Sequence, residues 1–404
     1  MTLNVRWNCG IEVKVEDTTI VFDPTSYNPE CNYALITHAH SDHSRGLSLP
    51  FSDRYCTEET VDIATIYRRI DEGWHRIKCG DKFRVGDLEV KVHNAGHILG
   101  SVIYEVISDE GNFVYTGDLN TVKTLTMEAA EAKSCDILAI DATFGSPSFI
   151  FPSREDLSVE IAKWSIETLR KNRIPTFQTD SIGNAQEITA ILNEMTNIPV
   201  VVHPRIGAVN RTYQSRGYSL NYIDAYSEEA TELISRRACA LILPKRAKVP
   251  EEAKVDLALA SGWAIYLKDR RKPIPLSDHA DFINLLRFIG ESNPKVVLTF
   301  HGGKRNSILA TYVKKKLGIE AKPISEGELS LENTGRKWSS RFVSCEREVL
   351  RTVKMRGFIY RLEWIQKILR VKGYSDEEVR VALRNLVRKG FLRLHSRDGE
   401  FEVK

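Results

Sequence analysis

The segment that most constrains this chain is Leu35–Gly46, written LITHAHSDHSRG. It begins within an apolar stretch that is predicted to be a strand, Tyr33–Thr37. After this strand it supplies four metal-capable side chains within six residues: His38, His40, Asp42 and His43. Imidazole nitrogens and carboxylate oxygens suit Zn²⁺ or a similar first-row ion. One His at a strand end would be an ordinary loop residue, but the pattern HxHxDH predicts a metal site.

HxHxDH resembles the second motif of the metallo-β-lactamase superfamily, and residues expected of later motifs follow in order. His97 lies between glycines in NAGHILGS, Asp118 directly follows the predicted strand Asn112–Thr116, and His301 ends a buried strand in VVLTFHGG. Alone, a His in a Gly-flanked loop or at a strand end is usually a surface or core-edge residue. Because His97, Asp118 and His301 follow HxHxDH in the expected order, we expect all three to be metal ligands.

The expected site holds two divalent ions. Its metal ligands are predicted to be His38, His40 and His97 on one ion, and Asp42, His43 and His301 on the other. Asp118 is the expected bridge, since two carboxylate oxygens can span ions about 3.5 to 4 Å apart. The ligand types favour Zn²⁺, with Mn²⁺ as the alternative. Asp23, which ends the predicted strand Thr19–Phe22, is either a turn residue or a carboxylate that orients a ligand, and the resemblance favours the second role.

Composition limits the remaining possibilities. A length of 404 residues predicts two or three domains, and 42% apolar with 27% charged residues is typical of soluble globular proteins. The sequence has no apolar run of about 18 residues and no signal-peptide pattern, so we expect a cytoplasmic protein without membrane contact. Seven scattered cysteines without CxxC spacing predict reduced thiols.

The part of the sequence that carries the motifs is interrupted by an inserted segment. Residues 1–152 and 273–330 carry the motifs, whereas residues 153–272 are predicted to form an inserted α/β domain. This insertion is expected to contain a helix after Ser153, the strand Ile174–Gln178 and a helix that starts near Ala185. Before it, Asp141 ends the predicted strand Ile137–Asp141. After it, His279 precedes a predicted helix, Phe282–Gly290, in SDHADF.

This arrangement resembles the beta-CASP nucleases over roughly residues 1 to 325, a group that includes the cleavage and polyadenylation nuclease and Artemis-like repair nucleases. The segments DATFG, GNAQE, ASGW and SDHAD are most similar to ligase-associated DNA exonucleases. The resemblance implies an α/β fold, namely a metallo-β-lactamase αββα sandwich with an inserted beta-CASP cap. It also implies that His279 protonates the leaving oxygen and that Asp141 orients His279.

A loop in the insertion, TDSIGN, is a candidate phosphate contact. It places Ser181 and Asn184 before a helix N-terminus, where backbone N–H groups can hold an anion, although an ordinary capped helix start has the same appearance. The family often has Lys or Arg where this chain has Asn184. We therefore expect Arg173, Arg205 or Lys245 as possible substitutes.

The last segment is basic. From Lys337 onward the chain has 17 Lys and Arg against 9 Asp and Glu, which leaves a mildly acidic remainder. Residues 341–404 are predicted to form a winged-helix-like domain with helices Glu346–Arg356, Tyr360–Val371 and Asp376–Lys389, followed by strands Phe391–His395 and Glu400–Val403. The third helix places Arg380, Arg384 and Arg388 on one face. That face could contact phosphates; the alternative is a solvated face of a dimerisation or protein-contact module.

These features predict a two-metal nuclease that uses a metal-activated hydroxide on single-stranded DNA, as an exonuclease in DNA repair or processing with partners of that pathway. Asp42 is expected to orient the nucleophile or accept its proton, and His279 to act as general acid. One alternative is an RNA-processing endo- or exoribonuclease of the cleavage and polyadenylation type. The others are a nucleic-acid-binding adaptor that does not cut, and a small-molecule hydrolase such as a thioesterase or lactamase.

Overall fold

The computed structural model describes residues 3–249, 254–324 and 329–330, and scattered residues between 349 and 403. The chain divides into two units: Met1–Val313 with Ile319–Leu331, and Lys314–Gly318 with Glu332–Lys404. Within the described part of the chain, no helix has the length and apolarity needed to cross a membrane. The six cysteines that the structure describes are all free thiols.

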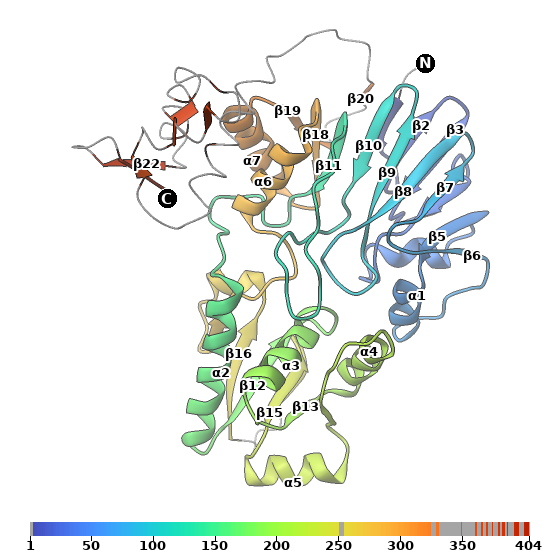
Figure 1. The fold of residues 1–404 in the computed structure, drawn as a ribbon. Helices are drawn as coiled ribbons and strands as arrows, with labels where there is room; N and C mark the ends of the chain where they lie inside the picture. Colours follow the sequence, from blue (N-terminus) through green and yellow to red (C-terminus); the bar gives the residue numbers. More distant parts are fainter. Residues whose placement is uncertain are drawn as a thin grey trace. The chain divides into compact units, whose positions relative to one another are not determined.

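The first unit is built around two seven-stranded sheets (Figure 1). The strand order in one sheet is β20 (Leu329–Ser330), β1 (Leu3–Trp7), β2 (Ile11–Val15), β3 (Thr18–Phe22), β4 (Tyr33–Leu35), β5 (Asp53–Thr57) and β6 (Trp74–Ile77). The order in the other is β19 (Glu320–Pro323), β18 (Val296–Phe300), β11 (Ile137–Asp141), β10 (Gly111–Tyr115), β9 (Val102–Ser108), β8 (Leu88–Asn94) and β7 (Lys82–Val85). The helices of this part are η1 (Ser44–Ser48), α1 (Glu58–Thr65), α6 (Phe282–Ser292) and α7 (Lys304–Tyr312). A further helix, η3 (Val313–Leu317), begins at the last residue of this segment and otherwise belongs to the second unit.

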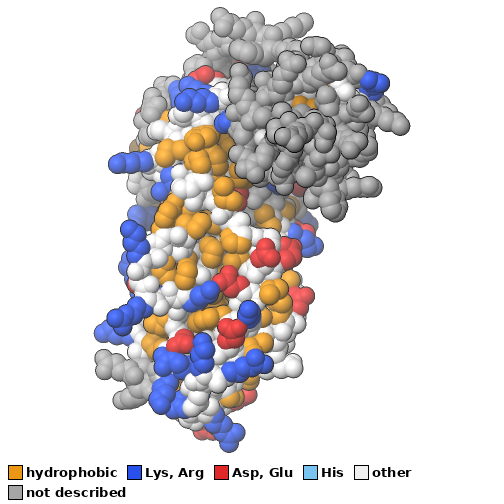
Figure 2. All heavy atoms as spheres, turned by 90° about the vertical axis from the view of Figure 1, so that its left-hand side faces the viewer, with side chains coloured by type: hydrophobic (Ala, Val, Ile, Leu, Met, Phe, Trp, Pro, Cys, Tyr) orange, Lys and Arg blue, Asp and Glu red, His pale blue; other side chains and the backbone are white. Residues whose placement is uncertain are grey.

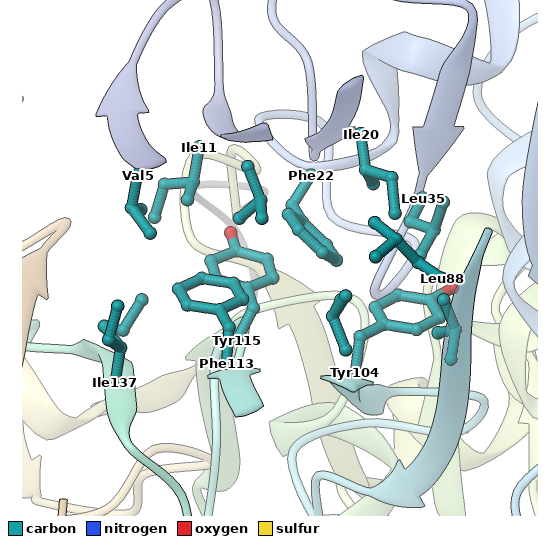
Figure 3. Close-up of a cluster of buried hydrophobic side chains, with 14 of the residues drawn as sticks. Val5, Ile11, Ile20, Phe22, Leu35, Leu88, Tyr104, Phe113, Tyr115 and Ile137 are labelled. Atoms are coloured by element: carbon teal, nitrogen blue, oxygen red, sulfur yellow. The ribbon is translucent and has the colours of Figure 1, made fainter. Parts of the chain in front are cut away.

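The main hydrophobic core lies between these two sheets. Alternate residues of the strands face inward, as in β1, where Leu3 and Val5 are fully buried. Phe22 is at the centre, with its ring 5.0 Å from Tyr115 and 5.7 Å from Phe113 of the opposite sheet. Figure 3 shows side chains of the two sheets meeting in this layer. The two sheets therefore form the sandwich that was expected, and their strand ends carry the loops of the candidate site.

A third, six-stranded parallel sheet is formed by the inserted segment. Its order is β14 (Ile223–Asp224), β13 (Val200–Val202), β15 (Ala240–Pro244), β12 (Ile174–Thr179), β16 (Val255–Ala260) and β17 (Lys272–Ile274). Its helices are α2 (Arg154–Arg170), α3 (Asn184–Met195), α4 (Pro204–Ser215), α5 (Glu228–Arg236) and η2 (Gly262–Tyr266). Leu157 and Ile161 of α2 and Ile188 of α3 pack with strand residues such as Phe177 in a separate core. This segment thus has its own sheet and its own core.

The insertion and the sandwich are joined by ion pairs. Arg216, which follows α4, donates to Glu59 Oε1 at 2.9 Å and to Asp62 Oδ2 at 2.7 Å, and both carboxylates belong to α1. Arg154 at the start of α2 donates to the Ser277 carbonyl, directly before the His279 loop. The second contact joins α2, the first helix of the insertion, to the loop that carries the candidate catalytic residue His279.

The second unit contains a three-stranded sheet of β21 (Tyr360–Arg361), β23 (Glu400–Val403) and β22 (Leu392–His395). The two predicted strands at its end are present. The helix predicted over Tyr360–Val371 is wrong at its start, because Tyr360 and Arg361 pair with Phe401 and Glu400. The unit has a small core of its own: Val349, Ile365, Leu369, Val379, Ala382, Leu383, Leu386 and Leu392. The three arginines predicted to face nucleic acid, Arg380, Arg384 and Arg388, lie outside the described residues.

Candidate metal centre and acid–base pair

Four candidate side chains converge at the carboxyl ends of strands in the two stacked sheets. His38 comes shortly after β4, Asp118 follows β10, Asp141 ends β11 and His301 follows β18. The predicted strand over Tyr33–Thr37 ends earlier, at Leu35, because the Thr37 N–H donates to Asp23 Oδ1 at 2.7 Å instead of extending the ladder.

The first group of donors consists of His38, His40, His97 and Asp118. His97 Nε2 lies 3.0 Å from His40 Nδ1 and 3.7 Å from Asp118 Oδ2, and His38 Nε2 lies 3.4 Å from the same oxygen. Ligand atoms about 2.1 Å from a tetrahedral zinc ion are about 3.4 Å apart. These separations therefore match the spacing of ligands around one ion.

The second group consists of Asp42, His43 and His301, again with Asp118. Asp118 Oδ1 lies 3.4 Å from His43 Nε2 and 3.2 Å from His301 Nδ1. Asp42 Oδ2 lies 3.6 Å from His301 Nε2 and 4.0 Å from His43 Nε2. The two oxygens of Asp118 thus face different groups, which is the arrangement that a bridging carboxylate requires.

The donor imidazoles differ in protonation. Burial lowers the pKa of His38 well below its ordinary value, and burial with the His279 charge lowers the pKa of His97 to about 4, so these two imidazoles are neutral. Burial also lowers the pKa of His43, but Asp118 and Asp23 outweigh it and raise this pKa to about 10, so a cation would have to displace its proton. Nε2 of His38 and Nε2 of His43 are buried without a hydrogen-bond partner, which would be costly unless a cation faced them. The residues present thus fit a pair of divalent ions.

Hydrogen bonds on the far side of the rings fix which nitrogen points to the site. His43 Nδ1 donates to Asp23 Oδ2 at 2.7 Å, and His97 Nδ1 donates to the Asp278 carbonyl at 2.8 Å. Thr37 Oγ1 donates to Asp23 Oδ2 at 2.6 Å, so it accepts from His38 Nδ1 at 2.9 Å. In each case the other nitrogen, Nε2, faces the site and could bind a cation.

Asp23 therefore lies behind the rings of His38 and His43. It also accepts a hydrogen bond from Tyr115 Oη at 2.9 Å. Thr37 and Tyr115 were not singled out from the sequence, and the position of Thr37 directly before His38 is the only feature that could have pointed to it. Asp23 (φ 47°) and His301 (φ 64°) both have left-handed backbone, at a cost of about 1 kcal/mol each. The surrounding contacts must hold these conformations.

Close backbone packing is also required before Asp118. Gly117 has φ 53°, and a Cβ on it would lie 2.7 Å from Thr37 Oγ1. A side chain at this position would therefore displace the threonine that orients His38. The glycine allows β10 and the histidine loop to approach each other.

His279 and Asp141 form a pair beside the two donor groups. His279 Nδ1 donates to Asp141 Oδ2 at 2.9 Å, while Asp141 Oδ1 accepts from Thr143 N and Oγ1, each at 2.7 Å. The other ring nitrogen, Nε2, lies 3.9 Å from Asp118 Oδ2 and 3.8 Å from Asp278 Oδ1. Burial lowers the pKa of His279, but Asp118 and Asp141 outweigh it and raise this pKa to about 10.

The donors differ in their exposure to solvent. His38, His43, His97 and Asp118 are at most 4% exposed, whereas the side chains of Asp42 and His301 are 60% and 33% exposed. The part of the site formed by Asp42 and His301 is therefore accessible from solvent.

The predicted phosphate loop packs against the loop of His279, since a Cβ on Gly183 would lie 2.5 Å from Asp278 Oδ2. Ser181 is half-buried, and Asn184 is 2% exposed as the first residue of α3. Two of the three candidate substitutes are paired elsewhere: Lys245 Nζ with Asp180 at 2.6 Å, and Arg173 with Asp256. Arg205 is exposed near the start of α4.

Comparison with known proteins identifies the family. A family model described as a beta-lactamase superfamily domain matches residues 5–170. An RNase J-like protein of Methanocaldococcus jannaschii is 32% identical over 348 residues, covering 68% of this chain and 82% of that protein. The chain belongs to the metallo-β-lactamase superfamily and its beta-CASP nuclease family.

Two further relatives match over less than half of their own length. A probable DNA ligase of Opitutus terrae is 30% identical over 282 residues, which cover 67% of this chain but 26% of that protein. Transcription termination factor FttA of Methanothermobacter thermautotrophicus is 29% identical, and the chain covers 40% of it. A solved Enterococcus faecalis protein of unknown function has the same fold, with a TM-score of 0.59, 16% identity and coverage of 82% of this chain and 100% of that chain.

Proposed function

We propose that this protein is a two-metal phosphodiesterase that hydrolyses nucleic acid, with single-stranded DNA as the preferred substrate. The observation that carries the proposal is the position of Asp118 between two sets of donors, with the His279–Asp141 pair beside it. Two bound cations would supply a nucleophile at neutral pH and neutralise charge on the phosphate.

The protein's own residues then have separate tasks. The exposed carboxylate of Asp42 can orient the nucleophile or accept its proton. His279, protonated through its contacts with Asp141 and Asp118, can donate a proton from Nε2 to the departing oxygen. Asp141, anchored by Thr143, keeps the ring of His279 in place. A nucleophilic serine or cysteine is not needed for this reaction.

Two observations bear on the substrate. The matched segment of the probable DNA ligase favours DNA. The RNase J-like protein, of which this chain covers 82%, supports RNA as the second candidate. A small-molecule hydrolase would leave the cap and His279 without a role, and a non-cutting adaptor would not require both donor groups.

The deciding experiment uses end-labelled single-stranded DNA and RNA of the same sequence with Zn²⁺ or Mn²⁺. We expect stepwise shortening of the DNA strand by the full-length protein and none by an Asp42→Ala/His43→Ala double variant. His279→Ala should slow cleavage by about 10²- to 10⁴-fold. Equal cleavage by the double variant, or cleavage of RNA alone, would overturn the mechanism or the DNA preference, respectively.

A further inference from the structure

An aromatic cluster leads from His279 toward the surface. Phe144 is 1% exposed, and its ring lies 5.7 Å from the ring of His279 and 5.0 Å from that of Trp263. Phe149 touches both Trp263 and Tyr266, at 5.3 Å and 5.2 Å between ring centroids. Trp263 and Tyr266 are 42% and 50% exposed, so the cluster begins at the acid–base pair and ends in solvent.

The local sequence places these rings together. Trp263 and Tyr266 belong to η2, which directly follows β16, and Phe144 follows the strand that carries Asp141. Gly262 allows η2 to pack on Phe144, because a Cβ there would lie 2.4 Å from the Phe144 ring. The helix η2, with Trp263 and Tyr266, is thus held by close packing against the loop that follows Asp141. Large aromatic side chains left half-exposed at this place need an explanation beyond core formation.

A cation completes the cluster. The Arg305 guanidinium lies 4.7 Å from the centre of the Trp263 ring and 5.8 Å from that of Phe149. Its Nε donates to the Thr143 carbonyl at 2.6 Å, which fixes it in place. Among the described residues, no carboxylate lies within ion-pair distance of this guanidinium. Lys304, which is exposed, directly precedes Arg305 and lies three positions after His301 in the sequence. A fixed positive charge therefore lies beside an exposed indole, near the second donor group.

We propose that Trp263, Tyr266 and Arg305 form a platform on which bases of a single-stranded substrate stack while its phosphates approach His279. Every base offers a π-face to an aromatic ring, and guanidinium groups both stack and bind phosphate. The described part of the face turned to the viewer in Figure 2 carries apolar side chains with Lys, Arg, Asp and Glu side chains among them. The proposal rests on the proposed function and specifies its substrate as an unpaired strand.

A consequence distinguishes this platform from a purely electrostatic surface. In a duplex the bases already stack on one another and cannot reach the rings, so the platform selects single strands. A strand that lacks bases but keeps its phosphates should lose the aromatic contribution and retain only the attraction to charge.

The test measures binding of the full-length protein to labelled strands in EDTA, so that it does not depend on cleavage. The probes are an oligothymidylate of about 20 nucleotides and an abasic strand of the same length. Trp263→Ala should weaken oligothymidylate binding by about 5- to 150-fold, the range for loss of one stacked base, and should leave abasic binding unchanged. Trp263→Phe, which keeps a ring, should retain most of the affinity. Tyr226→Ala is the matched control, since Tyr226 is 86% exposed and remains outside the cluster.

The outcomes separate this proposal from the proposed function. If Trp263→Ala binds oligothymidylate as tightly as the wild type, or loses the same factor on both probes, the platform is wrong even where cleavage is intact. If the wild type neither binds nor cleaves DNA or RNA, the proposed function fails and the platform with it. If Trp263→Ala unfolds, the comparison of Trp263→Phe with Trp263→Leu on the two probes decides.

Discussion

His279 Nδ1 lies 2.9 Å from Asp141 Oδ2, although 138 positions separate the two residues in the chain. The pair spans the inserted segment, since Asp141 ends β11 before it and His279 follows β17 after it. The hydrogen bond therefore joins the two sequence segments that flank the insertion. Burial lowers the pKa of His279, but Asp118 and then Asp141 outweigh it and raise this pKa to about 10.

We predict that Asp141→Asn moves the alkaline limb of the pH profile of kcat/KM to lower pH. The protonated form of His279 is the proton donor, and activity falls as the pH rises through its pKa. Removing the Asp141 charge lowers that pKa, so the fall begins earlier. The rate at the optimum should drop by about 10- to 100-fold, as for other partners that orient a catalytic group. A reduced rate with an unmoved limb would limit Asp141 to a structural role.

Metal binding should require Asp118 at both positions. We expect the wild type to bind two Zn²⁺ ions per chain by elemental analysis, and Asp118→Asn to bind one or fewer, because an amide nitrogen cannot act as a ligand. Zn²⁺ at about 100 times its Kd should stabilise the wild type by about 2.7 kcal/mol and raise its Tm by several degrees. His75→Gln, at an exposed His–Asp pair away from the site, should behave as the wild type. Two ions in the Asp118 variant would contradict the bridge.

Asp23 should matter more than its distance from the substrate suggests. It is 5% exposed and accepts hydrogen bonds from Thr37 N, Thr37 Oγ1, His43 Nδ1 and Tyr115 Oη. Asp23→Ala leaves these buried donors without an acceptor, so we expect the free energy of unfolding to fall by about 3 kcal/mol. We also expect metal binding to weaken by about 10- to 100-fold, because His43 is no longer oriented. Tyr115→Phe removes a single bond and should cost about 1 kcal/mol with metal binding retained. Equal effects of the two variants in urea unfolding would argue against the network.

The residue types and the order of the motifs pointed to side chains that the structure brings together, because the ability to bind a metal is a local property of each side chain. Asp118 follows a strand and His301 ends one, and carboxyl ends of neighbouring parallel strands meet at one sheet edge, as β10, β11 and β18 do here. The two-sheet sandwich followed from the same resemblance.

Other contacts could not be predicted, since they depend on three-dimensional packing. Nothing in the sequence around Tyr115 indicates that its hydroxyl reaches Asp23, 92 positions away. The start of the helix predicted at Tyr360 failed because pairing with Phe401 overrides the local helical pattern. The buried position of Asn184 likewise results from the packing of α3 and not from its own polarity.

A pair remote from the site should give a pH-dependent contribution to stability. His93 Nε2 lies 2.8 Å from Glu105 Oε2, and this hydrogen bond is the main reason that the pKa of Glu105 is below its usual value. A carboxylate with a lowered folded-state pKa stabilises the fold above its unfolded pKa, and the contribution disappears as pH falls through the folded pKa. Glu105→Gln should therefore cost at most about 1 kcal/mol at pH 7 and nothing at about pH 3. A cost that does not change between these pH values in urea unfolding would contradict this origin.

The basic segment should strengthen binding through phosphate contacts. Its core, which includes Val349, Leu369 and Leu383, is separate from that of the sandwich, so deletion of the residues after Lys337 should leave the first unit folded. Each phosphate contact adds about 0.7 to the slope of log K against log salt for single strands. If Arg380, Arg384 and Arg388 each contact one phosphate, both the deletion and a triple Gln variant should flatten the slope by about 2. The triple variant is the control for the deletion because it keeps the segment and removes the charges. If the slope is unchanged in both variants, the segment makes no phosphate contacts, because the loss of such contacts must change the salt dependence of binding. The segment would then be assigned to contacts with protein.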